Sequence, residues 1–286
     1  MFLDCGNICG QYWLSNSDDA WLFIIVTGGL TFSASNGLRN QLVRINPYSK
    51  RIDIFEITPI NPAGDLQPFN DMYSAKDGLY VTATTGNTFS FFSFATQSFT
   101  TYTVPTPASL PLGLFVDSNG IVYVAEFGAN KILTFNPKTK EMNEYVLPEL
   151  EQFPTVIRAE KDGYVYFALF TGNGIGRINM ITHKIDLYHT DQVGLIGAED
   201  TIDKYGGVWY SAFTDNVLSR LDTKTLKYSY VPFPDAFTKA LNAGSVAGEI
   251  PPYVDVAVNY GPGDAIWFTS IVTNQVGRYN ITGLYA

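Results

Sequence analysis

Three acidic side chains occupy one position of an internal repeat and could converge on a single site. Alignment of the repeats places Asp71, Glu199 and Asp255 near the start of the same strand in each unit. Converging carboxylates repel one another unless they are protonated, paired or bridged by a cation. The sequence therefore predicts either a hard-metal site, to which Asn70 would contribute, or a general acid or base. A third interpretation is that these carboxylates accept main-chain hydrogen bonds and tie neighbouring repeats together.

Glu126 is an acid that the repeat does not explain. Its equivalents in the other repeats carry no acid; they are Ala83, Leu169, Ala212 and Ser270. We therefore predict Glu126 as the main catalytic residue, in an acid–base role. Asp71 and Tyr253 complete the predicted catalytic set, with Tyr253 as a hydrogen-bond donor.

Aromatic residues recur in phase near the end of the second strand of each repeat. Phe127, Phe170 and Phe213 are spaced by 43 residues, and Thr84 is their equivalent in an earlier repeat. Part of this recurrence must reflect packing between repeats, yet aromatic side chains around a mouth also form an apolar binding cup. The predicted substrate-binding residues are Phe127, Phe170, Phe213, Trp21, Phe69, Thr84, Ser270, Glu199 and Asp255.

The elements that position these residues are revealed by a recurring asparagine. It stands at Asn87, Asn130, Asn173 and Asn216, a constant spacing of 43 residues, with further copies at Asn40 and Asn274. Each copy follows a glycine, an apolar run and a short turn, and precedes a second alternating run. Repetition at about 40 to 45 residues with strand-like units is typical of propeller blades. The six copies predict an all-β, six-bladed β-propeller in which residues 1–286 form a single domain.

The chain ends and two long connections complete the expected architecture. The last repeat stops after its third strand, at 275–280, whereas a surplus strand at 11–15 precedes the first repeat. We therefore expect the N-terminal strand to complete the last blade and so remove an open edge. The connections 59–69 and 232–252 both run from an outer strand to the next inner strand. Unless they are tolerated insertions, they mark one mouth of the channel as the working face.

Composition excludes several classes of function. The net charge is −9 and no basic cluster is present, so we expect no nucleic-acid partner. No apolar run reaches the roughly 20 residues that span a bilayer, so we expect no membrane partner. We also expect a monomer. The two histidines, His183 and His189, fall on the outer part of one blade, which argues against Ser–His–acid catalysis and against a zinc site.

Two short motifs bear on the cellular compartment. Cys5 and Cys9 lie in the segment CGNIC and could form a disulfide. Asn280-Ile281-Thr282 is the only N-glycosylation sequon of the chain. Together they favour the secretory pathway, with a signal peptide already removed.

The repeat text resembles the streptogramin B lyase-like propellers and, more loosely, the gluconolactonase and regucalcin superfamily. The segments that carry the resemblance are VYVAEFGANKI (122–132), GNGIGRIN (172–179) and IWFTSIVTNQVGRYN (266–280). In those lyases the reaction depends on magnesium and on histidines at the start of an inner strand and beyond a Trp-Phe-Thr-Glu segment. Here Ser270 replaces that glutamate, and no inner strand starts with histidine. The resemblance thus implies the fold without the histidine chemistry, although Glu126 takes the glutamate position in another blade.

A propeller of this group that lacks catalytic histidines but has an aromatic mouth resembles the fungal hetero-Diels–Alderases of tropolonic sesquiterpene biosynthesis. A cycloaddition requires two apolar partners in a reactive geometry and hydrogen-bond donors that polarise a ketone. The first expectation is therefore a cofactor-free secondary-metabolism cyclase acting on an apolar or aromatic small molecule. A lactonase or lyase that depends on one divalent metal ion is the second. A non-catalytic binding propeller is the third.

Overall fold

The computed structural model describes most of the repeated region. The described residues are 22–26, 41–46, 48–57, 71–192, 197–212, 217–232, 255–270 and 275–285. Some predicted features lie outside them, namely the closing strand at 11–15, the connection 59–69, most of the connection 232–252, Cys5, Cys9, Trp21, Phe69, Asn70, Phe213 and Tyr253. Those predictions stay predictions.

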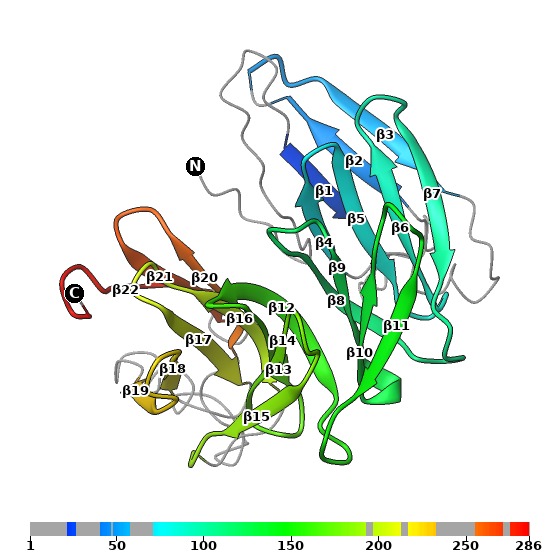
Figure 1. The fold of residues 1–286 in the computed structure, drawn as a ribbon. Helices are drawn as coiled ribbons and strands as arrows, with labels where there is room; N and C mark the ends of the chain where they lie inside the picture. Colours follow the sequence, from blue (N-terminus) through cyan, green and yellow to red (C-terminus); the bar gives the residue numbers. More distant parts are fainter. Residues whose placement is uncertain are drawn as a thin grey trace, which may run out of the picture. The chain divides into compact units, whose positions relative to one another are not determined.

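The described elements are antiparallel strands in six sheets, with one short 3-10 helix (Figure 1). The first sheet contains β1 (Leu22–Val26), β2 (Gln41–Ile45) and β3 (Ile52–Glu56). The second contains β4 (Met72–Ala75), β5 (Gly78–Ala83), β6 (Thr88–Ser93) and β7 (Ser98–Thr103). The third contains β8 (Pro111–Val116), β9 (Val122–Glu126), β10 (Lys131–Phe135) and β11 (Met142–Val146), with helix η2 (Phe127–Ala129) after β9. The fourth contains β12 (Pro154–Lys161), β13 (Tyr164–Leu169), β14 (Gly174–Asn179) and β15 (Ile185–His189). The fifth contains β16 (Gly197–Ile202), β17 (Gly207–Ala212), β18 (Val217–Asp222) and β19 (Tyr228–Pro232). The sixth contains β20 (Asp255–Gly261), β21 (Ala265–Ser270) and β22 (Gln275–Asn280).

Strand order follows the chain in every sheet, so each sheet is a meander of the kind that the repeat predicts. The predicted all-β repeat is confirmed, and the last strand of the last repeat has the predicted bounds. One local prediction is wrong: Phe127 was expected in the second strand but lies in η2, because β9 ends at Glu126. No helix among the described residues is long and apolar enough to cross a membrane.

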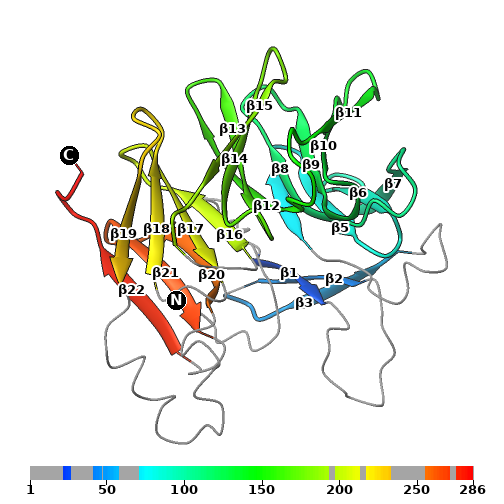
Figure 2. The same ribbon diagram turned by 90° about the horizontal axis from the view of Figure 1, so that it is seen from below.

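The chain, predicted as a single domain, is described as two compact units. The first comprises Met1–Ala129 and Leu133–Asn143, and the second Asn130–Ile132 and Glu144–Ala286. The boundary crosses the sheet β8–β11. Figure 2 shows the second unit's sheet β16–β19 from another direction. In each unit the core lies between neighbouring sheets, for example with Phe89 and Leu114 in the first unit and Trp209 and Val258 in the second, all fully buried.

The recurring asparagine has a structural role. Asn87 has a φ of 55°, a left-handed conformation that asparagine tolerates better than most residues. Its Nδ2 donates to the carbonyls of Val104 (3.1 Å) and Thr106 (3.0 Å), and its Oδ1 accepts from the backbone N–H (2.8 Å) and hydroxyl (2.9 Å) of Ser109. This asparagine clamp fastens the segment that leaves the outer strand β7 for the next sheet.

The clamp is repeated at the next two copies. Asn130 has a φ of 55° and accepts hydrogen bonds from the backbone N–H groups of Gln152 and Phe153, each at 3.0 Å. Asn173 has a φ of 43° and donates to the carbonyl of Gln192. The 43-residue period therefore reports the spacing of these fastened connections.

The glycine in the repeated Ile-Gly-Arg text makes room for an aromatic ring. Gly176 pairs with Phe167 across β13 and β14, and Gly277 pairs with Phe268 across β21 and β22. A Cβ atom at either glycine would collide with the ring of its partner. The glycine is thus required by close packing.

The arginine of the same text forms structural contacts, as its recurrence in phase predicts. Arg44 Nε lies 2.7 Å from Asp53, and Arg177 Nη2 lies 3.2 Å from Asp186. In each case the hydrogen bond from a basic side chain holds the pKa of the carboxyl below its usual value, chiefly Arg44 for Asp53 and Lys184 for Asp186. These arginines tie their strand to the next one in the sheet, β2 to β3 and β14 to β15.

Four first strands carry a β-bulge near their start. In β8, β12, β16 and β20 the pairing with the second strand skips a residue, as between Gly197 and Asp200 of β16. A bulge bends its strand and re-aims the side chains on it. Glu199 lies within the bulge of β16, and Arg158 lies at a second irregularity of β12.

Candidate active site

In the first unit, Asp71 ties two neighbouring sheets together. Its Oδ1 accepts from the N–H of Met72 and its Oδ2 from the N–H of Leu114, each at 2.8 Å. Leu114 belongs to β8, the first strand of the next sheet, just beyond its bulge. This is the arrangement expected if the repeated acids tie sheets together, and it places Asp71 as a support for β8.

Thr84 and Glu126, both predicted site residues, flank the same proline. The hydroxyl of Thr84 donates to the carbonyl of Pro111 at 2.8 Å, and Pro111 pairs with Glu126 across β8 and β9. Glu126 is fully buried, with 0% exposure. Burying a carboxylate is costly unless it is paired or hydrogen-bonded. A direct catalytic role for Glu126 therefore requires a ligand that penetrates to this level.

In the second unit, two hydrogen bonds join the neighbouring first strands β12 and β16. The hydroxyl of Thr155 donates to the carbonyl of Gly197 at 3.3 Å, and the N–H of Arg158 donates to Asp200 Oδ2 at 3.3 Å. Along β16, Glu199 lies between these two levels. The backbone of the predicted site residue Glu199 is therefore fixed beside β12 by the bonds to Gly197 and Asp200 on either side of it.

Arg158 and Glu199 carry opposite charges on the adjacent first strands β12 and β16, and Glu199 directly precedes Asp200, which accepts the N–H of Arg158. Both side chains are half-buried, whereas Asp200 is fully buried. Arg158 Nη1 donates to the carbonyl of Ile157 at 2.9 Å, which restrains the guanidinium near the bulge. A half-buried carboxylate can accept or release a proton. A neighbouring guanidinium can stabilise negative charge that develops on an oxygen.

Arg158 was not found by reasoning from the sequence alone. It stands two residues after Val156, the position equivalent to Glu199, and it is the only basic residue inside the described first strands apart from Lys161 at the end of β12. A lone cation among acidic first strands is the signal that could have identified it. Its bulged position could not have been predicted, because bulges depend on pairing geometry.

The remaining predicted residues are only partly described. Asp255 begins β20 and pairs with Ser270 of β21, so the structure places their backbones side by side. The half-buried Phe170 donates its N–H to the carbonyl of Phe153, and its own carbonyl accepts from the N–H of Gly197, both at 2.9 Å. These bonds fix the backbone of Phe170 between β12 and β16, while its side chain is partly exposed.

Both histidines lie away from the first strands. His189 ends the outer strand β15, at the opposite edge of its sheet from β12, and its Nε2 lies 3.2 Å from Glu149. His183 stacks on Tyr145 with ring centroids 4.6 Å apart, and burial lowers the pKa of its imidazole. Neither histidine therefore lies near Arg158, which is on the first strand of the same sheet.

Among the described side chains, no three His, Cys, Asp or Glu residues are placed to hold a metal ion. Asn70 and the side chain of Asp255 lie outside that description. The divalent-metal alternative, with Asp71, Glu199, Asp255 and Asn70 as ligands, is therefore still a prediction.

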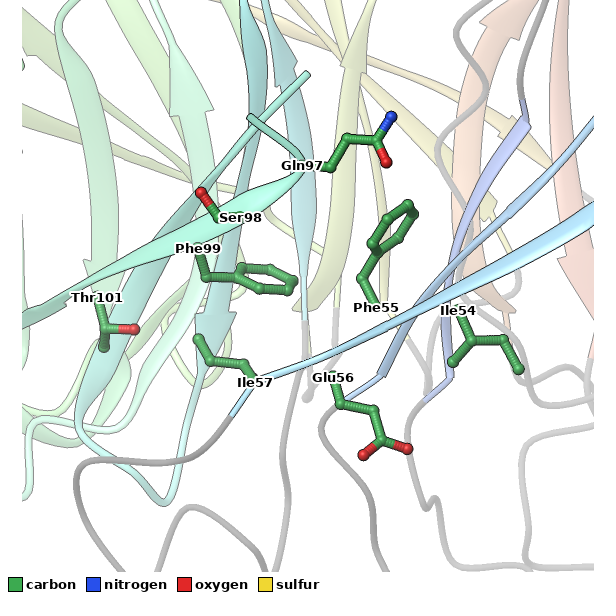
Figure 3. A pocket seen from close by; sticks show the side chains of 8 residues that line it. All are labelled: Ile54, Phe55, Glu56, Ile57, Gln97, Ser98, Phe99 and Thr101. Atoms are coloured by element: carbon green, nitrogen blue, oxygen red, sulfur yellow. The ribbon is translucent and has the colours of Figure 1, made fainter. Parts of the chain in front are cut away.

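A groove of about 540 Å³ lies in the first unit between the outer strands β3 and β7 (Figure 3). Its lining residues are Ile54, Phe55, Glu56, Ile57, Gln97, Ser98, Phe99 and Thr101. Phe55 and Phe99 both pack against the buried Phe92, with ring centroids 4.7 and 5.0 Å apart. The groove runs along edge strands and is distinct from the predicted cup near Thr84 and Glu126.

A family model described as the virginiamycin B lyase family matches residues 39–250 of the chain. No curated protein matches it. Among solved structures, it is 20% identical to virginiamycin B lyase from Staphylococcus aureus, with a TM-score of 0.72 over 95% of this chain and 84% of that chain. A structure described as streptogramin B lyase is 21% identical, with a TM-score of 0.72 over 94% and 82% of the two chains.

A more distant likeness extends beyond lyases. Hydrazine synthase of Kuenenia stuttgartiensis is 13% identical, with a TM-score of 0.68 over 94% of this chain and 77% of that chain. Because all these identities are low, the structural likenesses concern the fold alone, which agrees with the predicted propeller.

Proposed function

The chain belongs to the virginiamycin B lyase family, and we propose on that basis that it is a lyase-type enzyme acting on an apolar or aromatic small molecule. The observation that carries the proposal within this chain is the hydrogen bond from the N–H of Arg158 to Asp200, which joins β12 to β16 next to Glu199 and so brings an acid and a cation to adjacent first strands. Both side chains are half-buried, so both reach the surface from a rigid support. A site on strands is held more precisely than a site on loops.

The roles of the pair follow from the chemistry of an elimination. A base removes a proton from one carbon, a leaving group departs from the neighbouring atom, and a double bond forms between them. Glu199 would accept the proton at its carboxylate. Arg158 would stabilise the negative charge that develops on a carbonyl or leaving-group oxygen. Because the guanidinium supplies the positive charge, we propose that the step needs no metal ion.

Asp200 would act as a positioning residue for this pair. Its fully buried carboxylate accepts the N–H of Arg158 and so fixes the bulge from the neighbouring strand. A displacement of about 1 Å in such a support costs on the order of a hundredfold in rate. Asp71, whose carboxylate accepts a hydrogen bond from the N–H of Leu114, would likewise hold β8 in position next to β4.

A cofactor-free cyclase of the hetero-Diels–Alderase kind is a second candidate. It is favoured by the absence of histidine from the inner-strand starts, since the two histidines of the chain stand at positions 183 and 189. The two candidates share the need for a base, because an o-hydroxybenzyl alcohol generates the reactive diene by a 1,4-elimination in which the phenol loses its proton and the benzylic hydroxyl leaves as water. Glu126 could assist that step if the substrate reaches its level.

Two probes distinguish these candidates. Quinupristin tests ring opening by elimination, whose product has the mass of the substrate, whereas hydrolysis adds one water. An o-hydroxybenzyl alcohol incubated with an electron-rich alkene tests dehydration followed by cycloaddition, read by the loss of one water and the yield of adduct. We expect protein-dependent elimination with at least one probe. If neither probe reacts faster than in buffer, the enzyme proposal fails for both substrate classes, and the non-catalytic binding propeller is favoured.

Replacing Glu199 by glutamine is expected to lower kcat/KM on the reactive probe by about 10²–10⁴-fold, because a positioned general base contributes that much. The matched control is Glu160→Gln, which alters another half-buried acid on the adjacent strand β12. The control should keep nearly full activity. Full activity in Glu199→Gln would exclude Glu199 as the base, and a loss in Glu126→Gln alone would assign the base to Glu126.

A further inference from the structure

We propose that Asn280 is an acceptor for an N-linked glycan when the chain enters the secretory pathway. The sequon Asn280-Ile281-Thr282 is the only one in the chain. A sequon on its own is weak evidence, since short motifs arise by chance. The structure adds two independent observations, namely exposure and a fixed turn.

The three residues of the sequon are divided between the core and the surface. Ile281 is fully buried and packs in a cluster with Trp209 and Phe268. Asn280 and Thr282, on either side of it, are both exposed. The middle residue therefore anchors the segment while the acceptor amide and the required hydroxyl stay on the surface.

The backbone around the sequon is fixed in a turn. The N–H of Thr282 donates to Oδ1 of Asn280 at 2.9 Å, which forms an Asx turn. The N–H of Ile281 donates to the carbonyl of Asp264 at 2.9 Å, and the N–H of Gly283 to the hydroxyl of Tyr205 at 3.3 Å. The first of these bonds engages the oxygen of the Asn280 amide, whereas a glycan attaches at its nitrogen, Nδ2.

The tyrosine that holds the turn is itself held. Tyr205 donates its hydroxyl to Asp264 Oδ2 at 2.8 Å, and Lys204 Nζ lies 2.8 Å from the same oxygen. The hydrogen bond from Lys204 is the main reason that the pKa of Asp264 lies below its usual value. The turn is therefore a rigid part of the surface, so a glycan there would not need to displace folded structure.

The reaction is a glycosyl transfer from a lipid-pyrophosphate-linked oligosaccharide that the host supplies. A bond forms between C1 of the first sugar and Nδ2 of Asn280, while the bond from C1 to the pyrophosphate oxygen breaks. The amide loses one proton and the lipid pyrophosphate departs with the bonding electrons. No oxidant or reductant is involved.

The test is expression of the full chain behind a cleavable secretory signal in a eukaryotic host. The secreted protein is treated with peptide-N-glycosidase, which removes the glycan and converts the attachment asparagine to aspartate, and the peptide containing Asn280 is analysed by mass spectrometry. The wild type and Thr282→Ser should lose mass on treatment and carry aspartate at position 280. Asn280→Gln and Thr282→Ala should show neither change.

Thermal unfolding of each secreted variant separates loss of the glycan from loss of the fold. Secreted wild-type protein whose mass the glycosidase does not change would overturn the proposal. A glycan that persists in Asn280→Gln would overturn it as well. Neither result bears on the proposed elimination, because Asn280 lies on β22 and the Glu199 and Arg158 pair on β16 and β12.

Discussion

Replacing Asp203 by alanine is expected to lower the free energy of unfolding by about 3–5 kcal/mol, because it removes the buried carboxylate that binds Arg220 and leaves only the longer 3.6 Å contact of Arg220 with Asp222. Asp203 accepts hydrogen bonds from Arg220 Nε and Trp209 Nε1, each at 2.8 Å. It also accepts the N–H groups of Tyr205 (2.8 Å) and Gly207 (2.9 Å). The side chains of Asp203 and Arg220 are 0% and 4% exposed, so water cannot replace the lost contacts.

The measurement is urea-induced unfolding followed by tryptophan fluorescence and circular dichroism. The matched control is Asp186→Ala, which removes the partner of Arg177 from a more exposed ion pair. Such a pair is expected to contribute about 1 kcal/mol or less. Equal losses in the two variants would show that burial does not set the strength of these pairs.

Replacing Asn87 by alanine is expected to cost about 2–4 kcal/mol, the second-largest effect. The change removes the hydrogen bonds of the clamp to Val104, Thr106 and Ser109. Each unsatisfied buried group costs about 1–3 kcal/mol. Ser109 is fully buried, so its hydroxyl would lose its partner without gaining water. Alanine must also adopt the left-handed conformation of residue 87, at an additional cost of about 1 kcal/mol.

Two further variants separate these contributions. Asn87→Gly removes the side chain without the conformational strain, so the difference between glycine and alanine measures the strain less the greater unfolded-state entropy of glycine. Asn143→Ala is the surface control, because Asn143 is exposed on β11 and its Nδ2 contacts the exposed Glu141 at 3.1 Å. We expect the control to change stability by about 0.5 kcal/mol or less. If Asn87→Ala behaves like Asn143→Ala, the clamp does not stabilise the fold.

The repeat predicted the fold because each of its marked residues has a geometric duty. Asn87 and Asn130 adopt a conformation that few residues tolerate, and Gly176 makes room for a ring. Such requirements recur wherever the same turn recurs, so they are visible as spacing in a single sequence. This is why the meander of strands in each sheet and the bounds of the last strand, 275–280, were predictable.

The candidate site was less predictable because it depends on residues that differ from one repeat to the next and on irregular strand pairing. The sequence singled out Glu199, but not Arg158, whose position arises from an irregular pairing in β12. It also suggested a catalytic role for Asp71. In the structure this carboxylate accepts hydrogen bonds from the backbone N–H groups of Met72 and Leu114, and Leu114 lies 43 positions further along the chain. Side-chain partners at that distance depend on packing that periodicity does not specify.

The asparagine clamp has a consequence for the chemical ageing of the protein. Asparagine followed by glycine is the sequence most prone to deamidation, in which the next backbone nitrogen attacks the side-chain amide. Asn119-Gly120 lies exposed in a turn, whereas Asn173-Gly174 has its amide bound to Gln192 and its glycine paired with His189 in a sheet. Peptide mapping of stored protein should therefore find aspartate and isoaspartate at 119 well before 173. Equal rates at both positions would show that the clamp gives no such protection.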